Sequence, residues 1–286
     1  MKQIQWFPGH MAKARRQVEE KLQMVDIVYE LLDARIPYSS ENPMMAEIIK
    51  DKPRLLILNK TDLADELETK NWIQYYSSIG LTAIAVSSTQ GSPLKEVLSK
   101  SKELLKDLFE KETRRGLKSR SIRAMIIGIP NVGKSQFINR LAGKNKAKTG
   151  DKPGLTKTQV YLKAGDELEL LDNPGILWPK FEDEKSAFHL ALLGSIKEDI
   201  LPLDEVCIYG LNFLIKNYPK RLKEKYKLDT LEHESIVEII DQIGMNRGCI
   251  YKKGEIDYDR VYKLFLYDFR NMGFGYITIE RAEKNV

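Results

Sequence analysis

The chain contains little cysteine and little histidine, which narrows the kinds of site it can carry. Among 286 residues there are only two cysteines, Cys207 and Cys249, and three histidines. The cysteines are too few and too far apart for a zinc knuckle, so we expect free or buried thiols in a reducing compartment. His189 and His233 lie in helical patterns without partners of the kind that bind metals, so no zinc site is predicted.

Long apolar runs and repeats are also missing. No stretch reaches the ~18 apolar residues that a membrane span needs, and the N-terminus has no apolar signal core. We therefore expect a cytoplasmic protein with no membrane partner. The absence of internal repeats and low-complexity tracts argues against a solenoid or a disordered scaffold.

Neither sign of charge dominates the composition. The 46 basic residues oppose 41 acidic ones and leave a net charge of +5, which is compatible with nucleic-acid binding without requiring it. A hydrophobic content of 42% is enough for an ordinary globular core, and 286 residues favour two domains.

Strands and helices alternate in the first part of the predicted structure. Strands are predicted at residues 25–33, 54–59, 81–87, 122–127, 158–162 and 167–171, and helices at 10–24, 66–78, 94–112 and 134–142. This order is typical of an α/β sheet with buried parallel strands. The charged, weakly patterned residues 111–120 predict a surface linker.

The strand signal largely disappears beyond Pro179. Helical patterns follow at residues 184–197, 203–217, 231–244 and 258–270. We therefore predict a first domain over residues 1–180 and an all-helical domain over residues 181–286.

A phosphate-binding loop is predicted at residues 128–135, with the sequence Gly-Ile-Pro-Asn-Val-Gly-Lys-Ser. It follows a predicted strand and precedes a predicted helix, the context that such a loop requires. Its backbone N–H groups supply partial positive charge, Lys134 supplies a full charge, and the Ser135 hydroxyl is placed to bind Mg²⁺. The nucleotide-binding residues predicted here are Asn131, Val132, Gly133, Lys134, Ser135 and Gln136. A turn that merely joins strand to helix is the alternative.

A guanine-reading motif is predicted at Asn59-Lys60-Thr61-Asp62, at the end of a predicted strand. The Asp62 carboxylate can accept both guanine N–H groups, whereas adenine offers no such pair. A site built for that pattern can reject an analogue lacking it by roughly 10⁴-fold or more, which disfavours an ATP-dependent enzyme. Asn59 is expected to brace the phosphate loop and the Lys60 stem to pack along the base. By itself the tetrapeptide could be a solvated turn.

Further nucleotide contacts are predicted at other strand ends. Ser87 and Ser88 can bring a backbone N–H to the guanine carbonyl. Asp172 and Gly175 are the first and last residues of an Asp-Asn-Pro-Gly motif after the last predicted strand, where an Asp can hold Mg²⁺ through water and a Gly N–H can meet the γ-phosphate. A simple Pro-Gly turn is the alternative. Thr156 is our choice for completing the Mg²⁺ shell when triphosphate is bound, and Thr158 is the competing candidate.

The motifs occur in an unusual order, because the guanine-reading motif precedes the phosphate loop. A complete set of motifs in cyclic reordering indicates a permuted GTPase rather than chance matches. We therefore predict an α/β, P-loop GTPase domain with circularly permuted motif order, followed by a C-terminal all-helical domain.

Together these residues resemble the circularly permuted ribosome biogenesis GTPases of the YlqF/RbgA family. The resemblance extends over nearly the whole chain and includes residues 6–11, residues 33–37, Asn42-Pro43, Asp268-Phe269-Arg270 and residues 277–280. It implies GTP hydrolysis in late assembly of the bacterial large ribosomal subunit. The GTP-bound form would dock on the precursor, the helical domain would touch its rRNA, and ribosome-stimulated hydrolysis would release the protein.

The resemblance also implies a catalytic group and a cation. Ile176 stands where many GTPases carry a water-orienting Gln, and an aliphatic side chain cannot do that work. The family assigns this role to His10, which could instead pack at a helix start. Asn131 resembles the asparagine of K⁺-stimulated GTPases, so K⁺ is expected beside Mg²⁺. The alternative is that Asn131 simply tolerates the backbone geometry of the loop. Gln136 departs from the small Thr or Ser usual after Ser135.

Two functional alternatives stay open at this point. The basic segment around Tyr218 and Tyr226 suits RNA contacts, but it could be a solvated face. The protein, expected to be a monomer, could also be a non-catalytic RNA-binding assembly factor that holds guanine nucleotide as a structural ligand. Stimulation of GTP turnover by ribosomal particles distinguishes a GTPase from such a non-catalytic factor.

Overall fold

The computed structural model describes residues 16, 18–89, 91–143, 161–172, 183–231 and 235–282. The chain divides into two compact units, with one boundary between Lys180 and Phe181 and another between Ile279 and Glu280. The second boundary adds a feature that the expected helical domain of residues 181–286 did not contain: the described residues after Ile279 belong to the α/β unit.

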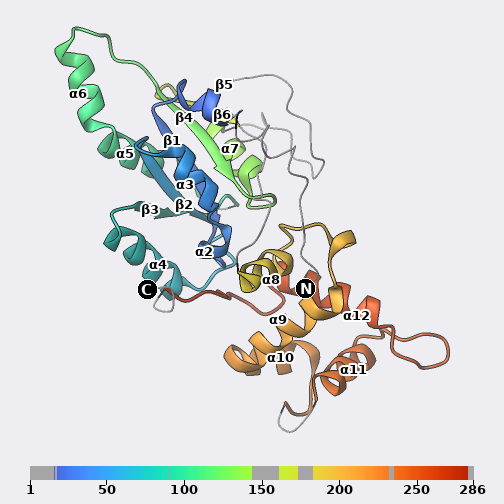
Figure 1. Cartoon of the computed structure of the whole chain (residues 1–286). Helices are drawn as coiled ribbons and strands as arrows, with labels where there is room; N and C mark the ends of the chain where they lie inside the picture. Colours follow the sequence, from blue (N-terminus) through green and yellow to red (C-terminus); the bar gives the residue numbers. More distant parts are fainter. Residues whose placement is uncertain are drawn as a thin grey trace. The chain divides into compact units, whose positions relative to one another are not determined.

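The α/β unit is built on a six-stranded sheet with the order β3-β2-β1-β4-β6-β5 (Figure 1). Its strands are β1 (Ile27–Asp33), β2 (Arg54–Asn59), β3 (Thr82–Ala85), β4 (Ile122–Gly128), β5 (Tyr161–Ala164) and β6 (Leu168–Asp172). All neighbours are parallel except β5 and β6. The central strands form because short apolar runs that are buried on both faces suit a parallel sheet; every residue of β1 is buried.

Helices cover both faces of this sheet. The helices of this unit are α2 (Pro37–Ser40), α3 (Pro43–Ile49), α4 (Glu66–Ser78), α5 (Leu94–Leu104), α6 (Lys106–Arg114) and α7 (Lys134–Ala142). Helix α6 continues from α5, has no buried residue and does not cover the sheet. Side chains of α3 and α4 pack with Val28 and Leu32, which lie on one face of β1. On the other face, the Tyr29 hydroxyl lies 2.7 Å from the Ser101 hydroxyl of α5.

The predicted linker at residues 111–120 is more ordered than expected. Helix α6 continues to Arg114. Arg120 forms a bidentate ion pair, at 2.7 and 2.8 Å, with Asp26, the residue directly before β1. Arg120 also contacts Glu112 at 2.8 Å. The charges that suggested a solvated segment thus anchor the connection between α6 and β4 to the sheet.

The strand order reverses direction next to β1. From β1 the chain builds outward through β2 to β3, and it then returns to place β4 on the opposite side of β1. In open α/β sheets, ligands bind outside the carboxyl ends of the strands at such a switch point. The phosphate loop follows β4 directly, so the topology places it at this position.

The helical unit contains α8 (Glu184–Leu192), the 3₁₀ helix η1 (Glu198–Ile200), α9 (Leu203–Asn217), α10 (Pro219–Tyr226), α11 (Ile236–Asn246) and α12 (Tyr258–Arg270). Helix α9 is central and packs against α8, α10, α11 and α12. A Cβ at its Gly210 would lie 2.8 Å from atoms of both Leu192 and Phe265, so glycine permits this close packing. The predicted helix at 184–197 ends earlier, because Gly194 follows with a φ of +74°.

Both cysteines lie in this unit as free, buried thiols, and burial raises the pKa of Cys207. In the described part of the chain, no helix is both long enough and apolar enough to cross a membrane.

Candidate functional site

The predicted nucleotide motifs converge at one edge of the sheet. Asn59 ends β2, Ser87 and Ser88 follow β3, and the phosphate loop follows β4. Asp172 ends β6, where its Cα pairs with that of Ile126. Because the carboxyl ends of parallel strands lie at the same edge, segments that are far apart in the sequence are brought together.

The phosphate loop has the backbone that its glycines permit. Gly133 has a φ of +92° and Asn131 a φ of +60°, and α7 begins at Lys134. A Cβ at Gly133 would lie 2.5 Å from the Asn59 Nδ2 atom. A Cβ at Gly128 would lie 2.9 Å from the Leu31 carbonyl oxygen of the neighbouring strand. Glycine is therefore needed at both positions for the loop to approach the other strand ends.

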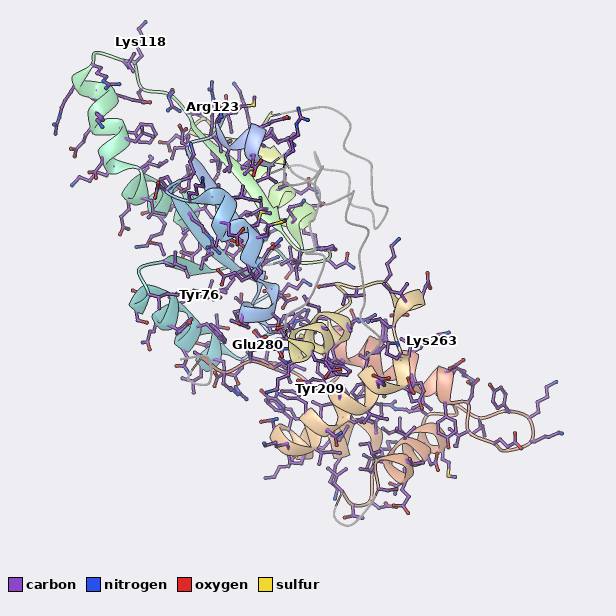
Figure 2. The ribbon with its side chains drawn as sticks, in the orientation of Figure 1. Tyr76, Lys118, Arg123, Tyr209, Lys263 and Glu280 are labelled. Carbon is purple, nitrogen blue, oxygen red and sulfur yellow. The ribbon has the colours of Figure 1, made fainter. Side chains whose placement is uncertain are left out.

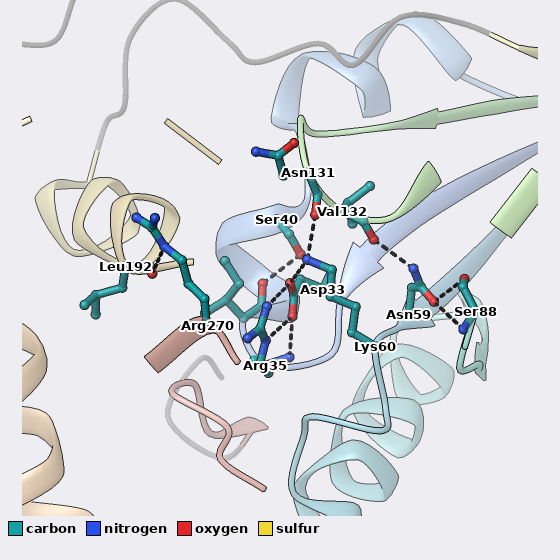
Figure 3. A network of polar contacts seen from close by, with 11 residues as sticks. Asp33, Arg35, Ser40, Asn59, Lys60, Ser88, Asn131, Val132, Leu192 and Arg270 are labelled. Carbon is teal, nitrogen blue, oxygen red and sulfur yellow. Dashed lines mark hydrogen bonds and ion pairs between the residues drawn. The ribbon is translucent and has the colours of Figure 1, made fainter. Parts of the chain in front are cut away.

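Asn59 joins the guanine-reading motif to the phosphate loop, as Figure 3 shows. Its fully buried side chain donates from Nδ2 to the Val132 carbonyl at 2.8 Å. Its Oδ1 accepts from the Ser88 backbone N–H at 3.2 Å and from the Ser88 hydroxyl at 2.7 Å. One amide thus fixes the ends of β2 and β3 and the loop after β4 relative to one another.

The Asp62 carboxylate is oriented by two hydroxyl groups. Ser87 donates to Oδ1 at 2.9 Å and Thr89 donates to Oδ2 at 2.8 Å. A carboxylate offers about four acceptor positions, so two bonds leave capacity for two further N–H donors. Thr89 belongs to none of the motifs in the sequence. Its spacing of two residues from Ser87 at a strand end is the only local signal for it.

Lys60 holds a position between two loops. Its Nζ lies 3.0 Å from the Asp33 Oδ2 and donates to the Asn131 carbonyl at 2.6 Å (Figure 3). Asp33, which ends β1, also binds Arg35 through two contacts of 2.9 Å. These contacts connect the end of β1, the guanine-reading motif and the phosphate loop. How the Lys60 stem lies against a base stays a prediction.

The charges in this network shift the ionisation of its members. Burial by itself raises the pKa of Asp33, but the adjacent charges of Arg35 and Lys60 outweigh it and hold the pKa of this carboxyl well below its usual range. Burial lowers the pKa of Lys60, and the Asp33 carboxylate offsets only part of that effect. Asp33 is therefore ionised across the physiological range and is the fixed anion of the network.

Sequence reasoning assigned no role to Asp33 and Arg35, although both belong to the segment that carries the family resemblance. The sequence did offer a signal, because Asp33 and Asn59 are the last residues of two consecutive predicted strands. The structure pairs these two positions. A buried aspartate at the end of a mostly apolar strand requires charged or polar partners, and Lys60 is the cation of the adjacent motif.

The residues available for Mg²⁺ are only partly described. Ser135 lies in the first turn of α7, and the backbone of Asp172 lies at the end of β6, next to β4. Thr156, Thr158, Gly175, Ile176 and the expected catalytic His10 lie outside the described residues. A hydroxyl beside the phosphate loop and an Asp at the neighbouring strand end fit an ion that binds hard oxygen ligands.

Gln136, the departure from the family pattern, is exposed in the first turn of α7. Among the described residues, no group of three or more His, Cys, Asp or Glu side chains could hold a metal ion.

The basic segment of the helical unit is partly engaged in its own fold. Arg221 stacks over the Tyr218 ring, with its guanidinium carbon 4.9 Å from the centroid, and binds the Tyr276 carbonyl. Lys225 pairs with Asp268 at 2.8 Å, and Lys223 donates to the Asp229 carbonyl at 2.8 Å. These three cations therefore stabilise α10 and its neighbours, which weakens a case for RNA binding based on their number alone.

Comparison with known proteins identifies the family. The family model described as 50S ribosome-binding GTPase matches residues 123–203, which contain the phosphate loop. Asn59 and Asp62 precede this range, as expected when the motif order is permuted.

The similar chains cover nearly the whole sequence. A ribosome biogenesis GTPase A of Bacillus licheniformis is 54% identical, with 98% of this chain and 99% of that protein covered. A protein of the same name from Thermotoga maritima is 30% identical, with 98% and 95% covered. The crystal structure of GNP-bound YlqF from T. maritima has a TM-score of 0.66 at 27% identity, with 95% of this chain and 99% of that chain covered. The chain therefore belongs to the ribosome biogenesis GTPase A family, with a circularly permuted GTPase domain followed by helices.

Proposed function

We propose that this protein binds GTP, hydrolyses it to GDP and phosphate, and uses the cycle in late assembly of the large ribosomal subunit. The observation that carries the proposal is the 2.8 Å hydrogen bond from the Asn59 side chain to the Val132 carbonyl, which links the guanine-reading motif to the phosphate loop. Such a bond serves a site in which base and phosphates are bound together. The names of the similar proteins supply the ribosomal context.

Binding is divided among the loops at the sheet edge. Asp62 accepts the two guanine N–H groups, held in orientation by Ser87 and Thr89. The Ser88 backbone N–H is bonded to the Asn59 Oδ1 at 3.2 Å, so Ser88 contributes by fixing the loop after β3 beside the base. Lys134 and the N–H groups of the loop neutralise the phosphates. A fixed acceptor pair makes the site selective for guanine over adenine.

Magnesium and potassium complete the proposed site. Ser135 and Thr156 would hold Mg²⁺, and Asp172 would hold it through water, while the Gly175 N–H meets the γ-phosphate. Bound there, the ion neutralises charge that develops on the phosphate oxygens. Asn131 would hold K⁺. The side-chain amide oxygen is the group proposed for the ion, while the backbone carbonyl accepts from Lys60 at 2.6 Å.

Hydrolysis needs a group that orients the attacking water. His10 is proposed for this role, because the aliphatic side chain of Ile176 cannot hydrogen-bond to water. We infer that ribosomal particles bring this histidine to the nucleotide, so that turnover is slow in the free protein and stimulated on the particle. Hydrolysis then releases the protein from the precursor, which the helical domain contacts through its rRNA. The monomeric state and the cytoplasmic location stay predictions.

The test is GTP turnover in K⁺ buffer with and without purified large ribosomal subunits or their precursors, with ATP as the control nucleotide. Stimulation restricted to GTP is expected, and Na⁺ in place of K⁺ should reduce it. Asp62→Asn should weaken GTP but favour the xanthine nucleotide, because xanthine carries a carbonyl where guanine carries its amino group. Binding of GTP without stimulation by any particle would support the structural-ligand alternative instead.

A further inference from the structure

The last described residues of the chain cap a helix beside the nucleotide site. The Glu280 carboxylate, 7% exposed, accepts from the Tyr38 N–H at 2.7 Å, from the Ser39 N–H at 3.1 Å and from the Ser39 hydroxyl. These groups lie in the first turn of α2, whose N-cap Ile36 makes no side-chain capping bond. Glu280 supplies the missing cap from a position 241 residues away from Ser39.

Neighbouring residues hold this terminal segment in place. The Trp72 indole N–H of α4 donates to the Glu280 carbonyl at 3.2 Å. Arg281 pairs with Glu68 at 2.9 Å, and Ala282 packs in the apolar cluster that contains Trp72 and Tyr76. Figure 2 marks Glu280 and Tyr76. With three residues anchored in three different ways, the segment is a fixed part of the α/β unit.

Helix α2 leads directly to the buried anion of the site. The Ser40 hydroxyl, at the end of α2, accepts from the Asp33 N–H at 3.0 Å and donates to the Ile36 carbonyl at 2.7 Å. Asp33 in turn holds Lys60 at 3.0 Å, and Lys60 holds the Asn131 carbonyl of the phosphate loop. An unbroken series of contacts therefore connects Glu280 with both loops that would bind the nucleotide.

We propose that Glu280 is a positioning residue for the guanine-nucleotide site, and that it acts through α2 and Asp33. The inference rests on the proposed function. The physical reason is preorganisation: when α2 is capped, Asp33 and Lys60 are held before nucleotide binds. When the cap is lost, part of the binding free energy is spent on ordering them. Glu280 touches no nucleotide in this scheme.

The variant Glu280→Gln tests the proposal, because it keeps the shape of the side chain and replaces one acceptor oxygen by an amide donor that faces N–H groups. Hydrogen bonds to a charged acceptor contribute about 1.5–3 kcal/mol each, of which only a part reaches the nucleotide. We expect GDP and GTP affinity to fall by about tenfold, equal to about 1.4 kcal/mol. The KM for GTP should rise while kcat stays within about twofold, as for loss of uniform binding.

The matched control is Glu238→Gln in the helical unit. Glu238 also accepts a backbone N–H near a helix start, from Ser235 at 2.7 Å, in the capping box of α11. This control should lower thermal stability without changing nucleotide affinity. If Glu280→Gln lowers the melting temperature but leaves GDP affinity within about twofold, the residue is a structural cap only and the proposal is wrong.

A second variant covers the case in which Glu280→Gln does not fold. Ser39→Ala removes one hydroxyl from the cap and leaves both backbone bonds, so a threefold loss of GDP affinity is expected and an unchanged affinity overturns the proposal. Fluorescent GDP binding by the wild-type chain is measured first. Failure of the wild type to bind guanine nucleotide would refute the proposed function, whereas failure confined to the variant comparison would refute only the role of Glu280.

Discussion

The substitution Asn59→Ala tests the link between the guanine-reading motif and the phosphate loop. It removes three hydrogen bonds from a fully buried side chain, namely those to the Val132 carbonyl, the Ser88 N–H and the Ser88 hydroxyl. At about 1 kcal/mol per bond the loss is about 3 kcal/mol. Water entering the space left by the amide would recover some of this, and groups left unpaired would add to it, so we expect 2–4 kcal/mol, or roughly a third of a typical domain's stability.

The assay is urea-induced unfolding without nucleotide and with GDP at 100 times the wild-type dissociation constant. Because the chain has two compact units, the transition of the α/β unit is followed separately. GDP should stabilise the wild type by about 2.7 kcal/mol. It should stabilise the variant by much less, since the loops that would bind base and phosphates are no longer fixed to one another.

The control for this prediction is Asn217→Ala. The Asn217 amide also donates to a backbone carbonyl, that of Phe213 at 2.9 Å, but it is exposed on α9. It should cost less than about 0.5 kcal/mol, as surface substitutions usually do. If Asn59→Ala is no more destabilising than this control, and GDP stabilises it as strongly as the wild type, Asn59 does not couple the two motifs.

Two further predictions concern the same network. Gly133→Ala forces a side chain onto a backbone with a φ of +92° and places its Cβ 2.5 Å from the Asn59 Nδ2. GDP affinity should therefore fall by at least about tenfold in a fluorescent-nucleotide titration. An affinity within about twofold of wild type would contradict the steric argument. Asp33→Asn removes the anion between Arg35 and Lys60, and breaking such a buried pair costs about 3–5 kcal/mol at neutral pH. Because the folded-state pKa of Asp33 lies below its unfolded value of about 3.9, its stabilisation is fully present above about pH 5 and is lost as the pH falls through that lowered pKa. Urea unfolding of both proteins between pH 3 and pH 7 should therefore show a difference that narrows toward acid; a difference independent of pH would contradict this assignment.

The sheet was predictable from sequence because buried parallel strands are marked by short apolar runs. The predicted strands at residues 54–59 and 122–127 agree with β2 and β4 to within one residue. Helices at 66–78, 203–217 and 258–270 coincide with α4, α9 and α12, whose apolar positions repeat at helical spacing.

The misplaced and missing elements have local causes. The predicted helix at 94–112 is two helices separated at Leu105, where no Gly or Pro signals a break. Helix α10 was not predicted because its basic sequence has only two buried side chains, Leu222 and Tyr226. Its start at Pro219 is nevertheless the position at which proline favours a new helix.

Residues that occur in motifs along the chain could be proposed for the site from sequence, whereas contacts between distant residues could not. Asn59 and Gly133 occur in recognisable motifs, so their residues could be selected before their contact was known. The contact of Glu280 with Ser39 spans 241 positions and has no periodic signal. Its capping role follows only from the packing of the terminal segment beside α2.

The chain connects the helical unit to the α/β unit at two places. The helical unit follows β6, which ends at Asp172, and it precedes Glu280, which caps α2. An RNA or protein bound to the helical unit can change nucleotide affinity only if it binds the nucleotide states with different free energies. If it does, thermodynamic linkage requires GTP to change the affinity for that partner by the same factor. Measuring both affinities with wild type and Glu280→Gln would show whether the terminal connection carries that coupling, since a smaller factor in the variant is expected only if it does.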